Sequence, residues 1–458
     1  MLLAWWATMS EAWADPPRAI LSSADYPSIQ AAVDAHPGEM IQIPFGRHVI
    51  QQAIRITKNG SGLAGHGIIV QENPNHPIVL IDGAEDARIE GLTLTRPVSE
   101  KPITADGILC RNANRATFSR VQVLENRSQA AAIRFDECED CTLQDSIVVN
   151  YKTIGIDDRT ANPLLGYAFH CIDGSGIVIT HSRRIAILDN QVSENVLLPT
   201  REIFEKHGLG KLTDGAKPTQ LGDLGRRAVE GDHVNNWHQG SAIVATSPTE
   251  TSHLLIRGNR LFHAAQGIDL HCDDSIISEN VIDHCMIGLK ATHGSSNLIM
   301  KGNLITHVDL WGIVINPGAS SSAGEPAKGN EPAKEPNVDA GIVISSNIIT
   351  HYGEGDEYWN WGGKHEDRGS SYAMAFMERQ LPSNPLLRDI LVEGNIVYDT
   401  SRDVPGASPG SARFRYAVLI EKNSSVPGGV QFWGNIFHPG KSGISNVPLD
   451  SAEKTSLK

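Results

Sequence analysis

Side chains that can transfer protons or bind metal ions are concentrated in two neighbouring segments, GIDLHCDD and GLKAT. The first segment contains Asp269, His271, Asp273 and Asp274, and the second contains Lys290. Imidazole and amine groups serve as general acids and bases, and carboxylates are ligands that Ca²⁺ prefers. We therefore expect proton transfer or calcium binding here, provided that the fold brings the two segments together.

A degenerate repeat predicts how they are positioned. It reads β-hydrophobic, x, x, Asn, x, apolar, and Asn259, Asn280 and Asn303 mark copies spaced about 22 residues apart. Other copies centre on Asn190, Asn347, Asn395 and Asn435. A unit of this length holds three short strands and three turns and is too short for a βαβ unit. The repeat predicts an all-β parallel β-helix in which the Asn side chains form an internal ladder.

A second signature, Gly-Ile-x-apolar-x, marks one strand of each coil. Its copies read GILCR, GIDDR, GIVIT, GIDLH, GLKAT, GIVIN and GIVIS. Because side chains alternate along a strand, Ile268 and Leu270 should point inward, and Asp269 and His271 outward. Adjacent parallel strands lie about 4.8 Å apart, so Lys290, one coil later, should join these two on a solvent-facing patch. Asp273 and Asp274 should lie in the turn beside it.

The same alignment places other charged residues in pairs. Arg134 should lie beside Asp157, and Asp136 beside Arg159, on consecutive coils. Such cross-strand ion pairs occur on any solvated sheet and contribute roughly 0.2–1 kcal/mol. Asp269 and Lys290 could be no more than another pair of this kind.

The remaining chain is organised around this stack. Residues 1–14 contain a short apolar stretch before Ala12-Trp13-Ala14, which favours a signal peptide and export to a secreted or periplasmic location. Residues 15–450 are predicted to form one β-helix domain, with residues 27–35 as a capping helix and 451–458 as a tail. Insertions are expected at about 199–238, 318–336 and 352–371, the second of them disordered.

Two further columns have structural interpretations. The six cysteines are too few for a disulfide framework of this length, and we interpret them as small core residues. His263, His284, His307 and His351 each follow a repeat Asn by four positions. We interpret them as a packing ladder in preference to a metal site.

Composition limits the classes of molecule that this protein can bind. The formal net charge of −14 argues against a nucleic-acid binder, which would need a basic face. No apolar run is long enough to span a membrane. A polysaccharide is compatible with both observations, because one basic groove or a bound cation would suffice for an anionic polymer.

The opening segment and the repeats together resemble a known group. The pattern Asp-x-x-Ser-Ile-Gln-Ala-Ala-Val-Asp, then Ile-x-Ile-Pro-x-Gly, then coils with Gly-Asn-x-Ile, is similar to the pectate-lyase-like, right-handed parallel β-helix superfamily. The resemblance extends from about residue 20 to about residue 440. It implies a right-handed coil and action on a polysaccharide, because the superfamily contains polysaccharide lyases, glycosidases, uronan epimerases and phage depolymerases.

The two chemistry-bearing segments also resemble β-helix lyases that bind Ca²⁺ through Asp residues and use a Lys on the next coil as the base. That resemblance implies Asp269, Asp273 and Asp274 as calcium ligands and Lys290 as the base. A lyase must neutralise the uronate carboxylate, remove the C5 proton and protonate the leaving oxygen. His271 is the alternative base. The leading hypothesis is β-elimination on a uronic-acid polymer.

Loop residues are candidates for substrate binding. Aromatic side chains in exposed loops commonly stack on ligands. The candidates are Trp237, His238, Trp359, Trp361 and, from the outward column, Arg159. The same aromatic side chains could equally pack their loops against the stack.

Three alternatives remain beside the lyase. A glycoside hydrolase or transglycosylase would use two carboxylates, drawn from Asp157, Asp232, Asp269, Asp273 and Asp274. A non-catalytic carbohydrate-binding β-helix would use none. GIDLH also resembles the Gly-Phe-Asp-Pro-His segment of mannuronan epimerases, but the Pro is absent, and Thr292 and Val314 stand where partner residues are expected.

Overall fold

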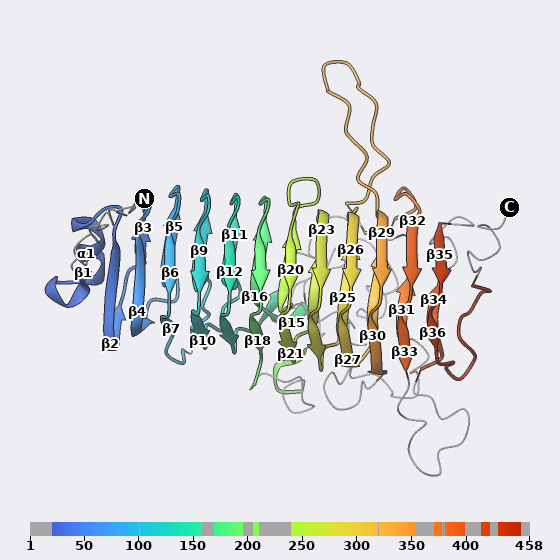
Figure 1. Ribbon diagram of the computed structural model, residues 1–458, viewed down its shortest axis with the longest axis horizontal. Coiled ribbons are helices and arrows are strands. Elements are labelled where there is room, and N and C mark those ends of the chain that lie inside the picture. Colours follow the sequence, from blue (N-terminus) through green and yellow to red (C-terminus); the bar gives the residue numbers. More distant parts are fainter. Residues whose placement is uncertain are drawn as a thin grey trace, which may run out of the picture.

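In the computed structural model, the coils stack into one continuous solenoid from the N-terminal end to the C-terminal end (Figure 1). The structure describes residues 21–99, 101–157, 169–195, 205–209, 240–318, 320–353, 371–377, 379, 381–398, 414–421 and 429–449. Residues 1–14 and 451–458, the predicted signal peptide and tail, lie outside these ranges. No helix among the described residues is long and apolar enough to cross a membrane.

Parallel strands from successive coils build the walls of the stack. One wall is an 11-stranded sheet, here called the GIDLH sheet because it carries the segments GIDLH and GLKAT. Its strands are β3 (Ile54–Ile56), β5 (Val79–Asp82), β8 (Ile108–Arg111), β11 (Ala131–Asp136), β16 (Ser175–Thr180), β19 (Ile243–Thr246), β22 (Gln266–Leu270), β25 (Ile287–Thr292), β28 (Trp311–Asn316), β31 (Tyr372–Phe376) and β34 (Tyr416–Ile420).

The other walls form a 23-stranded sheet that divides into two ladders after its first strands, β1 (Leu21–Ser22), β2 (Met40–Ile50) and β4 (Gly62–Gln71). One ladder contains β6 (Arg88–Glu90), β9 (Thr117–Ser119), β12 (Thr142–Gln144), β17 (Ala186–Leu188), β20 (Leu255–Arg257), β23 (Asp273–Ser278), β26 (Ser296–Lys301), β29 (Ala340–Ser345), β32 (Arg388–Glu393) and β35 (Val430–Trp433). The second contains β7 (Thr93–Thr95), β10 (Gln122–Leu124), β13 (Ile147–Val149), β18 (Gln191–Ser193), β21 (Arg260–Phe262), β24 (Val281–Asp283), β27 (Leu304–Val308), β30 (Ile348–Tyr352), β33 (Ile396–Tyr398) and β36 (Ile436–Phe437).

The N-terminal end of the stack is capped as the sequence predicts. After a short 3-10 turn, η1 (Ser23–Asp25), the helix α1 (Ile29–Ala35) begins at its N-cap Ser28, whose hydroxyl accepts a hydrogen bond from the Ala31 amide at 3.1 Å. Its apolar residues Ile29, Ala32 and Val33 pack on the core. The helix thereby covers apolar surface that a solenoid would otherwise leave open at its end.

The core is a column of stacked aliphatic side chains. The alternation predicted for the GIDLH sheet is confirmed, because Ile268, Leu270 and Leu289 are fully buried and belong to the main hydrophobic cluster. All six cysteines are buried, as predicted for small core residues. Cys110 and Cys138, from consecutive coils, bring their Sγ atoms to 3.7 Å.

The predicted asparagine ladder is present. Each Asn side chain accepts from both the backbone amide and the Nδ2 of the Asn on the preceding coil, at 3.0 Å from Asn259 to Asn280 and at 2.9–3.0 Å from Asn280 to Asn303. The ladder runs through Asn190, Asn259, Asn280, Asn303, Asn347, Asn395 and Asn435. Each amide therefore satisfies buried backbone groups at a turn, where unpaired polar atoms would be costly.

The histidine column also stacks. The rings of His284 and His307 lie parallel at 4.4 Å, and those of His307 and His351 are likewise 4.4 Å apart. Asp283 Oδ1 lies 2.9 Å from Nδ1 of both His284 and His307. The imidazoles of this ladder are thus packed on one another and held by a carboxylate.

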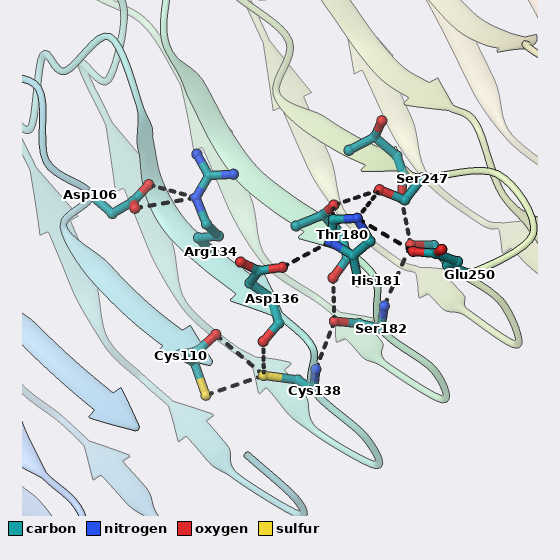
Figure 2. Close-up of polar contacts among 12 residues, drawn as sticks. Asp106, Cys110, Arg134, Asp136, Cys138, Thr180, His181, Ser182, Ser247 and Glu250 are labelled. Atoms are coloured by element: carbon teal, nitrogen blue, oxygen red, sulfur yellow. Dashed lines mark hydrogen bonds and ion pairs between the residues drawn. The ribbon is translucent and has the colours of Figure 1, made fainter. Parts of the chain in front are cut away.

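Two sequence predictions about the coils are wrong. The segment GIDDR does not enter the stack, because β14 (Thr153–Asp157) pairs antiparallel with β15 (Phe169–Asp173) as a separate hairpin. The neighbour of β11 is instead β16, so Arg134 lies beside Val178 and forms its ion pair with Asp106, at 3.1 Å (Figure 2). Asp136 likewise lies beside Thr180.

The insertions leave the register of the stack intact. The parallel pairing passes directly from β16 to β19, with Ile177 opposite Ile243, across the first insertion. The second insertion, expected to be disordered, instead forms an antiparallel arm with bridges such as Glu325 to Lys334, and it projects from the stack (Figure 1). Residues 354–370, within the third insertion, lie outside the described ranges.

The ladder supports a stability prediction. Replacement Asn280→Ala leaves the amide and Nδ2 of Asn259 without their buried acceptor, so we expect a loss of about 2–5 kcal/mol in the free energy of unfolding. Urea denaturation measures it. The exposed Asn75→Ala serves as the control and should change stability by less than about 0.5 kcal/mol. Equal stability of the two variants would show that the ladder does not hold the coils together.

Candidate functional site

The segments GIDLH and GLKAT lie on neighbouring strands of the GIDLH sheet. β22 and β25 pair in parallel with Asp269 directly opposite Lys290. The Lys290 ammonium lies 3.3 Å from Asp269 Oδ1 and 3.4 Å from Oδ2. The sequence prediction that these two residues are neighbours on consecutive coils is confirmed.

His271 completes the contact from the end of β22. Its Nε2 lies 3.1 Å from Asp269 Oδ1, and its Nδ1 lies 3.3 Å from the Thr246 hydroxyl on the preceding coil. A carboxylate can only accept, so Nε2 carries the proton that Asp269 accepts. In the neutral imidazole, Nδ1 then holds the lone pair and accepts a hydrogen bond from the Thr246 hydroxyl.

The cluster is more enclosed than the sequence suggests. The side chains of Asp269, His271 and Lys290 are only 10%, 16% and 21% exposed, so the predicted solvent-facing patch is wrong in that respect. Burial by itself would raise the pKa of Asp269, but the Lys290 ammonium and the hydrogen-bonded imidazole of His271 outweigh it and hold that pKa well below its usual range. Asp269 is therefore an ionised, buried anchor for two cationic or proton-transferring groups.

His293 is a fourth member that sequence reasoning missed. It follows β25, and its ring packs edge-on against His271 with centroids 4.6 Å apart. Burial, then the charges of His271 and Lys290, lower the pKa of His293 to about 3. Its Nδ1 accepts from the Ser320 amide at 3.3 Å, so His293 is a neutral imidazole. The sequence could have indicated His293, because it directly follows β25 just as His271 directly follows β22 on the preceding coil.

Apolar residues continue the column of Asp269 and Lys290. The outward column that contains Asp269 and Lys290 continues with Val314 and Ala375 on the next two strands. These two residues are buried in a second hydrophobic cluster outside the coils, together with Cys171 and other residues. Cys171 belongs to the hairpin β14–β15, so this hairpin contributes to the same apolar cluster. Asp269, His271, Lys290 and His293 are together called the Asp269 cluster.

The predicted calcium ligands do not come together. Asp273 begins β23 on a different wall, where its carboxylate accepts from the amide and hydroxyl of Ser296 at 2.9 and 2.7 Å. Asp274 accepts from Asn297 Nδ2 at 2.9 Å, and Asp269 is held by Lys290. These three carboxylates therefore do not fit a shared calcium ion. Among the described residues, the groups spaced to hold a metal are Cys110, Cys138 and Cys141, and Asp283, His284 and His307.

The predicted substrate-binding residues lie outside the described ranges. These residues are Arg159, Trp237, His238, Trp359 and Trp361. Asp232 lies outside as well, and the side chain of Asp157 is not described. Their roles stay predictions from the sequence.

A known family model matches part of the chain. It is described as a right-handed beta helix region and matches residues 52–215. No curated protein sequence matches the chain.

Three solved structures are similar to this chain at low sequence identity. The Dettilon tailspike protein is 12% identical with a TM-score of 0.51, covering 88% of this chain and 64% of the tailspike. An exopolygalacturonase from Thermotoga maritima is 12% identical with a TM-score of 0.47, covering 78% and 79% of the two chains. The A-module of a mannuronan C-5 epimerase from Azotobacter vinelandii is 12% identical with a TM-score of 0.44, covering 94% and 97%.

The chain spans less than two thirds of the tailspike, and identities this low establish the fold alone. The parallel coils, the stacked asparagine ladder and the matching family model agree on that fold. The chain is a right-handed parallel β-helix protein whose individual family is not identified.

Proposed function

We propose that this protein is a carbohydrate-active enzyme that cleaves a uronic-acid polymer by β-elimination, and that it acts outside the cytoplasm. The observation that carries the proposal is the Asp269 cluster, in which one ionised carboxylate holds a lysine and a histidine side by side on the face of a β-helix. The three tasks of a lyase can be distributed over these groups.

Lys290 is suited to neutralising the substrate carboxylate. The resemblance assigns it the role of base, but its ion pair with Asp269 presents it as a cation. A fixed positive charge beside a uronate carboxylate lowers the cost of forming the carbanion at C5. This role needs no bound metal, which accords with the separation of the predicted calcium ligands.

His271 is suited to moving the proton. Because Nε2 donates to Asp269, Nδ1 has the lone pair that can accept the C5 proton once substrate displaces the Thr246 hydroxyl. The resulting imidazolium is stabilised by Asp269 and can return the proton to the leaving glycosidic oxygen. The C5–H and C4–O bonds break, and the C4–C5 double bond forms.

Lys290→Ala tests the assignment. We expect elimination to fall by about 10²- to 10³-fold, because a charge that stabilises the transition state is removed. The measurement is the far-ultraviolet absorbance of the unsaturated uronide released from a panel of uronic-acid polymers, with neutral glycans for comparison. Lys301→Ala, on an exposed position of β26, is the matched control and should retain full activity.

Other outcomes would reject the proposal. Full elimination by Lys290→Ala would remove Lys290 from the mechanism. New reducing ends without unsaturated product would indicate a hydrolase instead of a lyase.

Asp269→Asn should lower stability in a pH-dependent way. The amide leaves the half-buried Lys290 without its counter-charge, so we expect a loss of about 1–3 kcal/mol near pH 7. The pKa of Asp269 is lower in the folded chain than in the unfolded chain. The stabilisation is therefore complete above about pH 4 and is lost progressively below it. Urea denaturation should show a constant difference in the free energy of unfolding between wild type and variant from about pH 7 to about pH 4, and a shrinking difference below about pH 4. A difference independent of pH would contradict the ion pair.

Chelation tests the calcium prediction. Because the three carboxylates engage separate partners and Lys290 can supply the positive charge, we expect EDTA to leave elimination unchanged. The measurement compares initial rates before and after dialysis against EDTA. Loss of activity restored by added Ca²⁺, but not by Mg²⁺, would show that a calcium site exists.

A further inference from the structure

A second group of polar side chains lies on the same wall, on the three consecutive strands β11, β16 and β19 that directly precede β22 in the sheet. Asp136 ends β11, His181 follows β16, and Ser247 follows β19 (Figure 2). His181 lies between the carboxylate and the serine hydroxyl, with its side chain 46% exposed. An acid, an imidazole and a hydroxyl therefore meet at an accessible position on three neighbouring coils.

Hydrogen bonds connect the carboxylate, the imidazole and the hydroxyl in sequence. His181 Nδ1 lies 3.0 Å from Asp136 Oδ1, and His181 Nε2 lies 3.0 Å from Ser247 Oγ. The ionised carboxylate can only accept, so Nδ1 carries the proton. Nε2 of the neutral ring then accepts from the Ser247 hydroxyl. This order of donors and acceptors polarises Ser247 Oγ as a nucleophile.

The coil register generates this arrangement. Asp136, Thr180 and Thr246 occupy one column of the sheet, opposite one another on β11, β16 and β19. The residues after Thr180 and Thr246 are His181 and Ser247, and both adopt left-handed backbone angles, with φ of 47° and 73°. The turns after β16 and β19 thus place the His181 imidazole and the Ser247 hydroxyl on consecutive coils, beside the column of Asp136, Thr180 and Thr246.

We propose that Asp136, His181 and Ser247 form a catalytic triad that hydrolyses a carboxylic ester. Ser247 Oγ attacks the ester carbonyl carbon while His181 Nε2 takes the hydroxyl proton. The carbonyl π-bond electrons move to the oxygen and return as the C–O bond to the alcohol breaks. The imidazolium gives its proton to the departing alcohol, which leaves an acyl-serine. Water then attacks this acyl group by the same route, releasing the carboxylic acid and restoring Ser247.

Two neighbours assist the step. The Thr180 hydroxyl lies 2.8 Å from Ser247 Oγ and 3.1 Å from His181 Nδ1, within reach of the oxyanion that forms beside Ser247. Glu250 Oε2 lies 3.4 Å from His181 Nε2, farther away than Ser247 Oγ at 3.0 Å, and its side chain is largely exposed. Ser247 is therefore the nearer partner of Nε2, and the negative charge of Glu250 stabilises the imidazolium that forms during acylation and deacylation.

The position indicates the substrate class. Thr246, next to Ser247, is the residue whose hydroxyl contacts His271 of the Asp269 cluster. A substrate lying along this wall would therefore reach both groups, and an ester carried as a substituent on a sugar polymer fits that arrangement. We infer that the ester is an O-acyl group on a glycan. This last assignment rests on the proposed function, whereas the triad itself does not.

The triad is tested without any sugar. The probes are p-nitrophenyl acetate, with release of p-nitrophenol measured, and a fluorophosphonate, with the modified residue located by peptide mass spectrometry. We expect the wild type to hydrolyse the ester and to be labelled at Ser247. Ser247→Ala should lose labelling and at least about 10³-fold of the hydrolysis rate, and Asp136→Asn should lose a similar factor.

A matched variant separates this effect from a general change in structure. Ser346→Ala replaces another exposed turn serine with a left-handed backbone, φ of 55°, and should match the wild type in both assays. Circular dichroism shows whether each variant is folded. Hydrolysis that persists in folded Ser247→Ala, or a label on a different residue, would overturn the triad.

A third arm separates the two proposals. Release of acetate from an acetylated uronic-acid polymer tests the glycan assignment, and it is measured separately from unsaturated product. Hydrolysis of p-nitrophenyl acetate without acetate release would leave the triad standing and reject the glycan substrate. Acetate release without unsaturated product would support the triad and reject the lyase.

Discussion

The fixed register between coils is the constraint on which the structure depends. Each strand pairs in parallel with its counterpart one coil away, and the asparagine ladder repeats that register at a buried turn. An Asn side chain can accept two hydrogen bonds and donate two, which is what a buried turn between identical neighbours requires. A slip of one residue would point every inward side chain outward and break the ladder at once.

This register also makes chemistry between distant residues possible. Asp269 and Lys290 meet because their strands are in register, and so do Asp136, His181 and Ser247 across three coils. The two groups differ in environment. The Asp269 cluster is largely enclosed, and Asp269 is a buried counter-ion there, whereas the His181 side chain remains open to solvent. Enclosure strengthens electrostatic contacts.

Departures from the repeat shape the site. The hairpin β14–β15 leaves the stack, and its residues Cys171 and Ile172 share an apolar cluster with Val314, the sheet neighbour of Lys290. The same departure moves Arg134 to Asp106 and frees Asp136 to contact His181. Because β16 and not β14 pairs with β11, the ion pair of Arg134 and the contact of Asp136 with His181 both differ from those that the repeat predicts.

The sequence alone determined the β-helix, the asparagine ladder, the capping helix and the contact of Asp269 with Lys290, because these follow from periodicities of two and of about 22 residues. The tertiary structure decided which Gly-Ile segment enters the stack, since β14 carries the same signature as the strands that do. It also decided the enclosure of Asp269, the approach of His293 and the separation of Asp273 and Asp274 from Asp269. These depend on packing outside the coils and on the direction of each turn, which repeat patterns do not encode.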